Sequence, residues 1–286
     1  MVENMKTHKL ARRTVERRIL MLIVLLLFAC LVFINSNYRE TIHIRQVPRV
    51  RRRDVLQDPI FKNSADELSF TKQEVVDFVK NVDTKVRGHE LDYKQSGGGT
   101  DVARIISMMS IKDHLEGKAF ERALLINEGD MSNPYIETHS KQVDQTQYKK
   151  TSTGKVIGDI HDLNYIPGNS YDLIYMPQTL EHAHNPFLAI QNIYRITNHG
   201  GLVISSQPFI TRPHMTPIHY FGFTPYGVES VFSSSGFVVE KIKCWGNDEY
   251  AKKVLIDRKW PKLNDMEDFS TSKNRYAQCT IFAKKN

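Results

Sequence analysis

The chain has 286 residues and a formal net charge of +7. This charge is concentrated at one end: residues 1–53 contain 12 Lys and Arg against 3 Asp and Glu, which leaves 27 basic and 29 acidic residues in 54–286. Residues 54–286 are therefore nearly neutral, which argues against a nucleic-acid-binding surface. No nucleic-acid partner is expected.

An uncharged apolar stretch follows the basic tail at 1–18. It runs from Ile19 to Ile34 as ILMLIVLLLFACLVFI, with neither Pro nor Gly. A membrane-spanning helix needs about 20 residues, and polar residues after Ile34 can complete the span at the interface. We therefore predict a transmembrane signal-anchor at 19–36. A cleaved signal peptide would usually show a small-residue cleavage site, which is absent, and a buried core helix would rarely have Arg-rich flanks.

The distribution of basic residues predicts the orientation of this anchor. Five Lys and Arg lie between residues 9 and 18, whereas only Arg39 and Arg45 lie close on the other side. The positive-inside rule then places 1–18 in the cytoplasm and the rest in the lumen, as in a type II single-pass protein. The cluster at 49–53 opposes this assignment. A short span also favours the thinner endoplasmic reticulum or Golgi membrane.

Residues 37–70 are polar, basic and interrupted by Pro, and are predicted to form a stem before a domain at 71–286. Strand and helix patterns then alternate, which predicts an α/β fold: a Rossmann-like doubly wound sheet of about seven strands, mostly parallel, with an antiparallel last strand. The linker 246–276 is polar and irregular. Helices are expected at 71–82, 101–115, 186–197 and 225–235, and strands at 122–127, 155–160, 171–177, 201–208, 237–245 and 277–284.

Three cysteines are present, and Cys30 lies inside the apolar stretch. Cys244 and Cys279 fall in the last two predicted strands. If these strands are neighbours, a disulfide is geometrically feasible and suits an oxidising lumen. The alternative is two free cysteines in the core.

Residues 158–209 contain, in order, the motifs GDIHDL, YDL, LEH, NP, YRI and GG, and a predicted strand follows them. This order of motifs, the strongest part of a pattern that extends from residue 122 to 284, resembles the class I S-adenosylmethionine-dependent methyltransferase superfamily, including its uncharacterised methyltransferase-like branch. The resemblance implies that S-adenosylmethionine is the cofactor and that it binds at the carboxyl ends of the strands.

The resemblance also implies cofactor-binding residues. Asp144, taken to follow the second strand, would accept the ribose hydroxyls, and a plain loop Asp is the alternative. Asp159 and Ile160 would hold the adenine unless they form only a solvated turn. Pro177 would face the methyl donor. The first turn has Asn127, Glu128 and Gly129 where the family usually has two glycines, so only Gly129 remains of them.

A loop with three polar aromatic side chains follows the fifth strand. In related sequences it overlies the substrate, so His214, His219 and Tyr220 are candidate substrate contacts. His214 and His219, with His182 of the LEH motif, are candidate catalytic bases because the pKa of histidine lies near neutral pH. The alternative is a loop that only packs against the sheet. No short ligand spacing indicates a metal, and none is expected.

These observations predict a membrane-anchored methyltransferase that O-methylates a glycan, or a lipid head group, in the secretory pathway. One alternative is an inactive methyltransferase-like binding module, because the glycine turn is degenerate. Another is a cytosol-facing enzyme acting on a small-molecule acceptor. The sequence gives no indication of the oligomeric state.

Overall fold

A computed structural model describes residues 65–82, 85–86, 89–90, 101–126, 133–146, 148–150, 156–214 and 218–286 of the chain. The predicted tail, anchor and most of the stem lie outside these residues, as do Asn127, Glu128 and Gly129. Among the residues that the structure does describe, no helix has the length and apolar character needed to cross a membrane.

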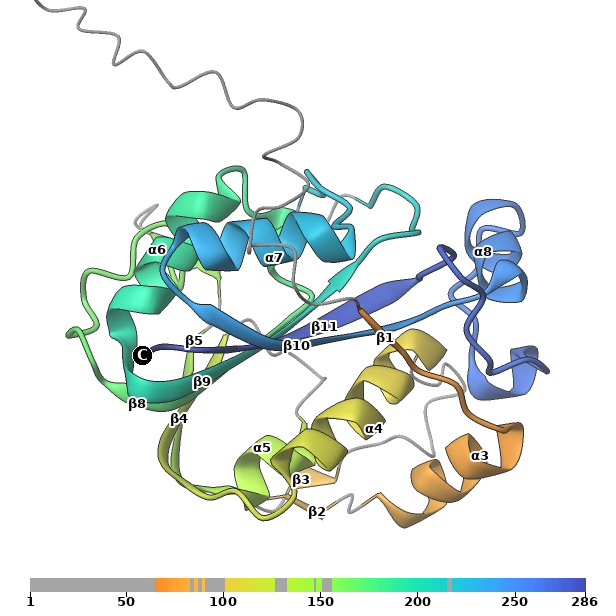
Figure 1. Cartoon of the computed structure of the whole chain (residues 1–286), viewed down its shortest axis with the longest axis horizontal. Coiled ribbons are helices and arrows are strands. Elements are labelled where there is room, and N and C mark those ends of the chain that lie inside the picture. Colours follow the sequence, from red (N-terminus) through yellow and green to blue (C-terminus); the bar gives the residue numbers. More distant parts are fainter. Residues whose placement is uncertain are drawn as a thin grey trace, which may run out of the picture. The chain divides into compact units, whose positions relative to one another are not determined.

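A seven-stranded sheet organises the described domain (Figure 1), and its strand order is β1-β10-β11-β9-β8-β4-β5. Neighbouring strands are parallel except that β11 is antiparallel to both β9 and β10. The predicted mostly parallel sheet with an antiparallel last strand is confirmed. The bounds are β1 Asp66–Glu67, β4 Phe120–Ile126, β5 Ser140–Thr146, β8 Tyr171–Pro177, β9 Thr197–Pro208, β10 Val238–Trp245 and β11 Gln278–Lys284.

Helices cover both faces of this sheet (Figure 1). The helices α6 (Pro186–Ile196) and α7 (Pro225–Ser234) lie on one face, where their buried residues share a core with Leu124 and Ile126 of β4. The helices α4 (Val102–Leu115) and α5 (Pro134–Thr138) lie on the other, against Ala123 and Leu125. Alternate residues of one strand thus enter two separate cores, as the pleat of a strand requires.

Each predicted helix begins at a side chain that caps it. Thr71 forms a capping box with Glu74 at the start of α3 (Lys72–Asn81). Asn185 accepts from the Leu188 N–H at 3.1 Å before α6, and Thr224 accepts from the Gly227 N–H at 3.0 Å before α7. Such caps satisfy N–H groups that have no partner inside the helix, which explains why the sequence fixes these starting points well.

Three elements differ from the prediction. The strand expected at 155–160 does not join the sheet: only β7 (Val156–Ile157) forms, paired with β6 (Lys149–Lys150). Gly158, with φ of 73°, ends the extended backbone there. Asp66–Glu67 of the predicted stem instead forms β1. In the expected irregular linker, Asn247 caps a helix, α8 (Asp248–Leu255).

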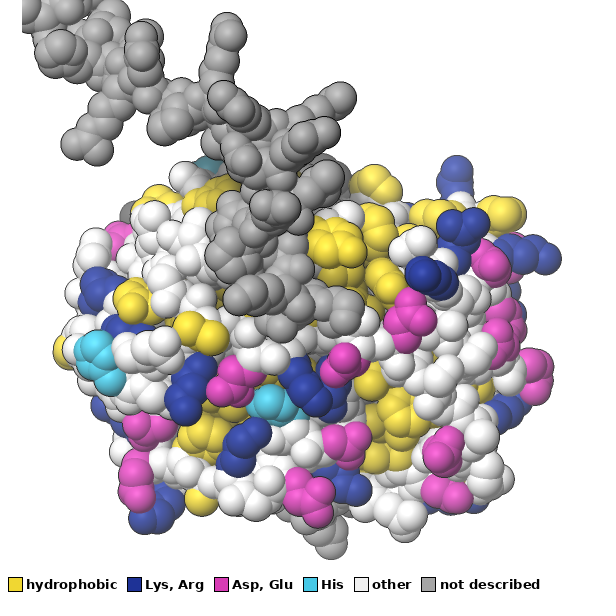
Figure 2. Space-filling view, viewed as in Figure 1, with side chains coloured by type: hydrophobic (Ala, Val, Ile, Leu, Met, Phe, Trp, Pro, Cys, Tyr) yellow, Lys and Arg dark blue, Asp and Glu magenta, His cyan; other side chains and the backbone are white. Residues whose placement is uncertain are grey.

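The remaining elements are short. A β-hairpin pairs β2 (Lys85–Val86) with β3 (His89–Glu90). In the described part of the chain, the 3₁₀ helices η2 (Leu180–His182) and η3 (Leu263–Asp265) connect longer elements. On the face drawn in Figure 2, Lys and Arg side chains alternate with Asp and Glu, as the near-neutral charge of this part of the chain predicts.

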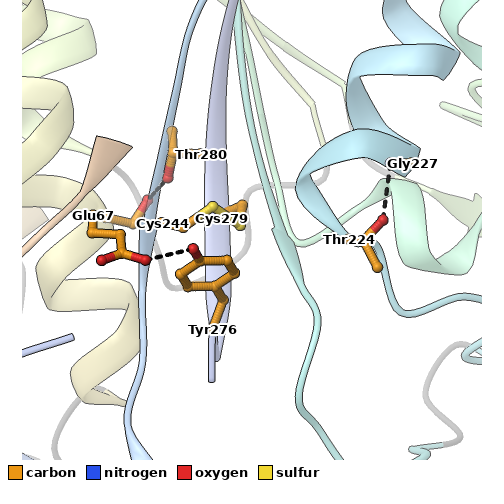
Figure 3. The surroundings of a disulfide bond; sticks show 8 residues. Glu67, Thr224, Gly227, Cys244, Tyr276, Cys279 and Thr280 are labelled. Atoms are coloured by element: carbon orange, nitrogen blue, oxygen red, sulfur yellow. Dashed lines mark hydrogen bonds between the residues drawn. A yellow bond between two sulfur atoms is a disulfide. The ribbon is translucent and has the colours of Figure 1, made fainter. Parts of the chain in front are cut away.

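A disulfide joins Cys244 of β10 to Cys279 of β11, two residues that are direct partners in the strand register. Beside it, the Tyr276 hydroxyl donates to the Glu67 carboxylate at 2.7 Å and so ties β1 to this corner of the sheet (Figure 3). Of the two alternatives that the sequence leaves open, the structure therefore has the disulfide, and the bond is buried in the core that α7 shares.

Removal of this disulfide should destabilise the domain. The cross-link closes a loop whose ends are 35 residues apart, which on a chain-entropy basis contributes about 4 kcal/mol. We expect the double variant Cys244→Ser/Cys279→Ser to show a correspondingly lower free energy of unfolding in denaturant titrations. Reductant should lower the stability of the wild-type protein but leave the variant unchanged. Equal sensitivity of both proteins to reductant would contradict this.

Candidate functional site

The site is built where β8 and β9 end side by side. Met176 and Pro177 pair with Ser205 and Ser206 in parallel register. Gln178 follows with φ of 45°, an uncommon backbone conformation for a residue other than glycine. Its N–H donates to the Ser206 carbonyl at 2.8 Å. The chain therefore turns sharply at the carboxyl edge of the sheet, where parallel α/β folds bind ligands.

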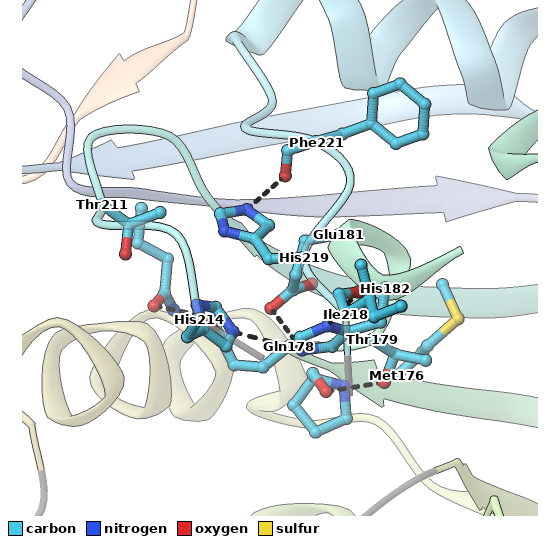
Figure 4. A network of polar contacts seen from close by, with 12 residues as sticks. Met176, Gln178, Thr179, Glu181, His182, Thr211, His214, Ile218, His219 and Phe221 are labelled. Atoms are coloured by element: carbon cyan, nitrogen blue, oxygen red, sulfur yellow. Dashed lines mark hydrogen bonds and ion pairs between the residues drawn. The ribbon is translucent and has the colours of Figure 1, made fainter. Parts of the chain in front are cut away.

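The turn after β8 also holds the predicted substrate loop in place. In η2, the backbone carbonyl of Glu181 accepts N–H groups from Tyr220 at 2.8 Å and Phe221 at 3.3 Å. These bonds join two segments about 40 positions apart in the chain and position the loop over the LEH motif (Figure 4).

The three candidate histidines come together at this point, as Figure 4 shows. The Nε2 atoms of His182 and His214 are 3.3 Å apart, and the ring centroids of His214 and His219 are 4.6 Å apart. His219 uses its Nε2 to bond the Phe221 carbonyl at 2.7 Å. Tyr220 is about half exposed and lies against His184 rather than among these rings.

Glu181 precedes His182 in η2, with its Oε1 3.9 Å from the His182 Nε2, and it is fully buried. Burial raises the pKa of its carboxyl to about 8 and lowers the pKa of both His182 and His214 below the ordinary value. Glu181 is a residue of this site that the sequence does not predict. The sequence signal for Glu181 is its position next to His182, shortly after a strand. Its burial depends on tertiary packing, which the sequence pattern does not specify.

The predicted adenine-binding turn is well fixed. The Asp159 Oδ1 accepts from the backbone N–H of His161 at 2.9 Å and contacts its Nδ1 at 2.6 Å. Asn192 of α6 donates to the carbonyls of Ile160 and His161 at 3.2 and 2.8 Å. Ile160 is buried, whereas a third of the Asp159 side chain remains exposed. This leaves part of the carboxylate available to a ligand.

Asp144 is placed differently from the prediction. It lies inside β5, opposite Leu124, rather than after the strand. Its Oδ2 accepts from Arg122 Nε at 2.8 Å and from the Tyr171 hydroxyl at 3.1 Å. Tyr171 is the first residue of β8, so the Asp144 side chain is engaged near the amino-terminal end of the sheet. The structure does not bring it together with Asp159 and His182.

Comparison with known proteins identifies the domain. Residues 121–205 match the family model described as "Methyltransferase domain". This part of the chain is a class I S-adenosylmethionine-dependent methyltransferase domain. The cofactor of that family is S-adenosylmethionine, as the sequence predicts. No curated protein matches the chain.

Solved structures resemble the methyltransferase domain at low identity. A S-adenosylmethionine-dependent methyltransferase from Archaeoglobus fulgidus is 17% identical, with a TM-score of 0.41 over 62% of this chain and 94% of that one. Another, from Mesorhizobium loti, is 14% identical, with a TM-score of 0.44 over 63% and 98%. A third, described as putative, is from Listeria monocytogenes and is 11% identical, with a TM-score of 0.44 over 63% and 98%.

Asp159 provides a direct test of cofactor binding by the methyltransferase domain. We expect Asp159→Ala to weaken the affinity for S-adenosylmethionine by roughly 10-fold or more in calorimetry, because a partly buried hydrogen bond to a polar ligand group is lost. Asp162→Ala is the matched control, since this exposed carboxylate lies on the same turn and bonds only locally to Asn164. Unchanged affinity in Asp159→Ala would refute the adenine assignment.

Proposed function

We propose that this chain is a membrane-anchored methyltransferase that O-methylates a hydroxyl group of a glycan in the lumen of the secretory pathway. A lipid head group is the second acceptor class. The assignment to a methyltransferase domain supplies the reaction type. The anchor at 19–36, the stem and the acceptor class are inferences from the sequence and from the residues around the site.

The disulfide between Cys244 and Cys279 is the main observation in favour of a location in the secretory pathway. Disulfides persist in the secretory pathway and are rare in reducing compartments. The bridge lies in the core and is therefore part of the stable fold. Together with the apolar stretch from Ile19 to Ile34, it supports a domain that folds on the lumenal side of a membrane.

The residues at the carboxyl edge favour a hydroxyl acceptor. A glycan hydroxyl is weakly acidic, so its transfer reaction gains from a group that binds or removes its proton. His214 and His219 of the predicted substrate loop lie together with His182 of η2. The remaining contribution of the protein is alignment, because methyl transfer is an in-line displacement at the sulfonium.

A transfer assay tests the reaction. We expect purified full-length chain to move a labelled methyl group from S-adenosylmethionine to a glycan fraction from secretory-pathway membranes, and Asp159→Ala to lose most of this transfer. Lipid extracts and small-molecule pools form the other arms of the experiment. Labelling confined to the lipid extract would show that the acceptor is a lipid head group rather than a glycan. Binding of the cofactor without methyl transfer to any pool would indicate a non-catalytic module.

Membrane orientation is tested separately. The paired changes Val50→Asn and Arg52→Thr create a glycosylation sequon in the predicted stem, whereas Val50→Gln with Arg52→Thr does not. We expect the first chain alone to gain an endoglycosidase-sensitive mass in cells, because glycosylation occurs in the lumen. An unmodified chain in an intact membrane fraction would favour the cytosol-facing alternative.

A further inference from the structure

Three potential ligand atoms converge from two segments of the chain. Glu181 and His182 come from η2, and His214 comes from the loop after β9 (Figure 4). One side-chain atom from each residue lies within 4.8 Å of the other two. The Nε2 atoms of the two histidines are 3.3 Å apart, and Glu181 Oε1 is 3.9 Å from the His182 Nε2.

The hydrogen bonds of the two imidazoles determine which nitrogen carries the proton. His182 Nδ1 contacts the Ile218 carbonyl at 3.0 Å, and His214 Nδ1 contacts the Arg212 carbonyl at 3.3 Å. A carbonyl oxygen can only accept, so each Nδ1 is the donor and each neutral ring has a lone pair on Nε2. Two lone pairs therefore face each other across 3.3 Å, an arrangement that a shared cation would stabilise.

Glu181 places a carboxyl group at the same point, which becomes a negatively charged ligand when a metal ion displaces its proton. Its side chain is fully buried, and neither carboxylate oxygen has a hydrogen-bond partner in the part of the chain that the structure describes. Burial without a hydrogen bond disfavours the ionised carboxylate by several kcal/mol, and coordination to a metal ion would offset that cost. Arg104 of α4 lowers the pKa of this carboxyl electrostatically, but it makes no hydrogen bond to it.

We propose that Glu181, His182 and His214 bind a divalent transition-metal ion. Two imidazoles and a carboxylate are a donor set typical of zinc and of other first-row metals. In a tetrahedral zinc site with Zn–N bonds of about 2.0–2.1 Å, two ligating nitrogens lie about 3.3–3.4 Å apart. The observed separation of 3.3 Å agrees with this, and a small rotation of the Glu181 side chain brings its oxygen into range.

The surroundings of the cluster match a metal site as well. Histidine ligands usually donate their second ring N–H to a carbonyl or carboxylate, which fixes the ring orientation. Both His182 and His214 do this through Nδ1. Three protein ligands leave a fourth tetrahedral position open to water or to a substrate oxygen, the arrangement of catalytic rather than structural zinc sites.

If the proposed O-methylation holds, the open position is where the acceptor hydroxyl binds, and this role alone rests on the proposed function. Coordination lowers the pKa of the hydroxyl, whose proton leaves to solvent. The oxygen then forms a bond to the methyl carbon while the carbon–sulfur bond of S-adenosylmethionine breaks. The bonding pair stays on sulfur, and the products are the methyl ether and S-adenosylhomocysteine.

Metal titration tests the inference directly. Untagged full-length chain, purified in detergent and stripped with chelator, is titrated with Zn²⁺ by competition calorimetry, and with Co²⁺ by visible absorption. We expect one ion per chain and tetrahedral Co²⁺ bands. Glu181→Gln and His214→Asn should weaken binding by more than the roughly 10- to 100-fold typical of a lost outer-shell partner. His184→Asn is the matched control, because this exposed histidine stacks on His161 outside the cluster.

Binding of S-adenosylmethionine, measured on the same proteins, shows that the variants fold and separates the two claims. Zinc binding in the wild type that is lost in Glu181→Gln and His214→Asn but kept in His184→Asn supports the metal site, whether or not methyl transfer is seen. Cofactor binding without zinc binding overturns the metal site and leaves the proposed function standing. Equal loss in His184→Asn, or a preference for Mg²⁺ over Zn²⁺, also overturns it.

Discussion

The central strand β8 is the constraint on which the candidate site depends. It pairs with β4 on one side and β9 on the other, and six of its seven residues are buried. A strand enclosed in this way cannot shift its register without moving a whole row of apolar side chains out of the core. Its end at Pro177 is therefore fixed, and so is the turn that carries Glu181 and His182.

The same constraint gives the substrate loop a defined anchor. The loop between β9 and α7 extends from residue 209 to 224, and a surface loop is ordinarily more mobile than the elements it connects. Here the Glu181 carbonyl accepts hydrogen bonds from two N–H groups of the loop, and the His182 Nδ1–H donates to the loop carbonyl of Ile218. The polar contacts of the site thus belong to the hydrogen-bond network that ends the strand, which explains how side chains from distant segments reach a common point.

The sequence predicts the elements whose boundaries are set locally. The predicted bounds of β8 agree with the observed ones, because a mostly apolar run ends at Pro177 and polar residues follow it. The helices that begin after Thr71, Asn185 and Thr224 are predicted from the pattern of their residues, and in the structure a local side-chain cap sets the start of each. By contrast, β1 has only two residues and forms through pairing with β10, so no local pattern could have indicated it.

The sequence predicts which residue types form the site, but it does not predict how deeply each of them is buried. The three histidines were recognised from their motifs and do lie together. Asp144 was misplaced because KQVDQT has no turn residue to mark the end of its strand. The unpaired state of Glu181 depends on what packs around it, and a sequence pattern does not specify that. The exposed part of Asp159 likewise follows from the bonds that α6 makes to its turn.

The position of β11 has a consequence for the order in which the domain assembles. This strand lies between β9 and β10, although both precede it in the chain. During synthesis those two strands emerge with unpaired edges that remain open until β11 arrives, and such edges are prone to wrong pairing. Until β11 is synthesised, Cys244 lacks its disulfide partner. Formation of the disulfide with Cys279 then links β11 covalently to β10. Because the two cysteines are partners in the strand register, the bond can form only after β11 has taken its place in the sheet.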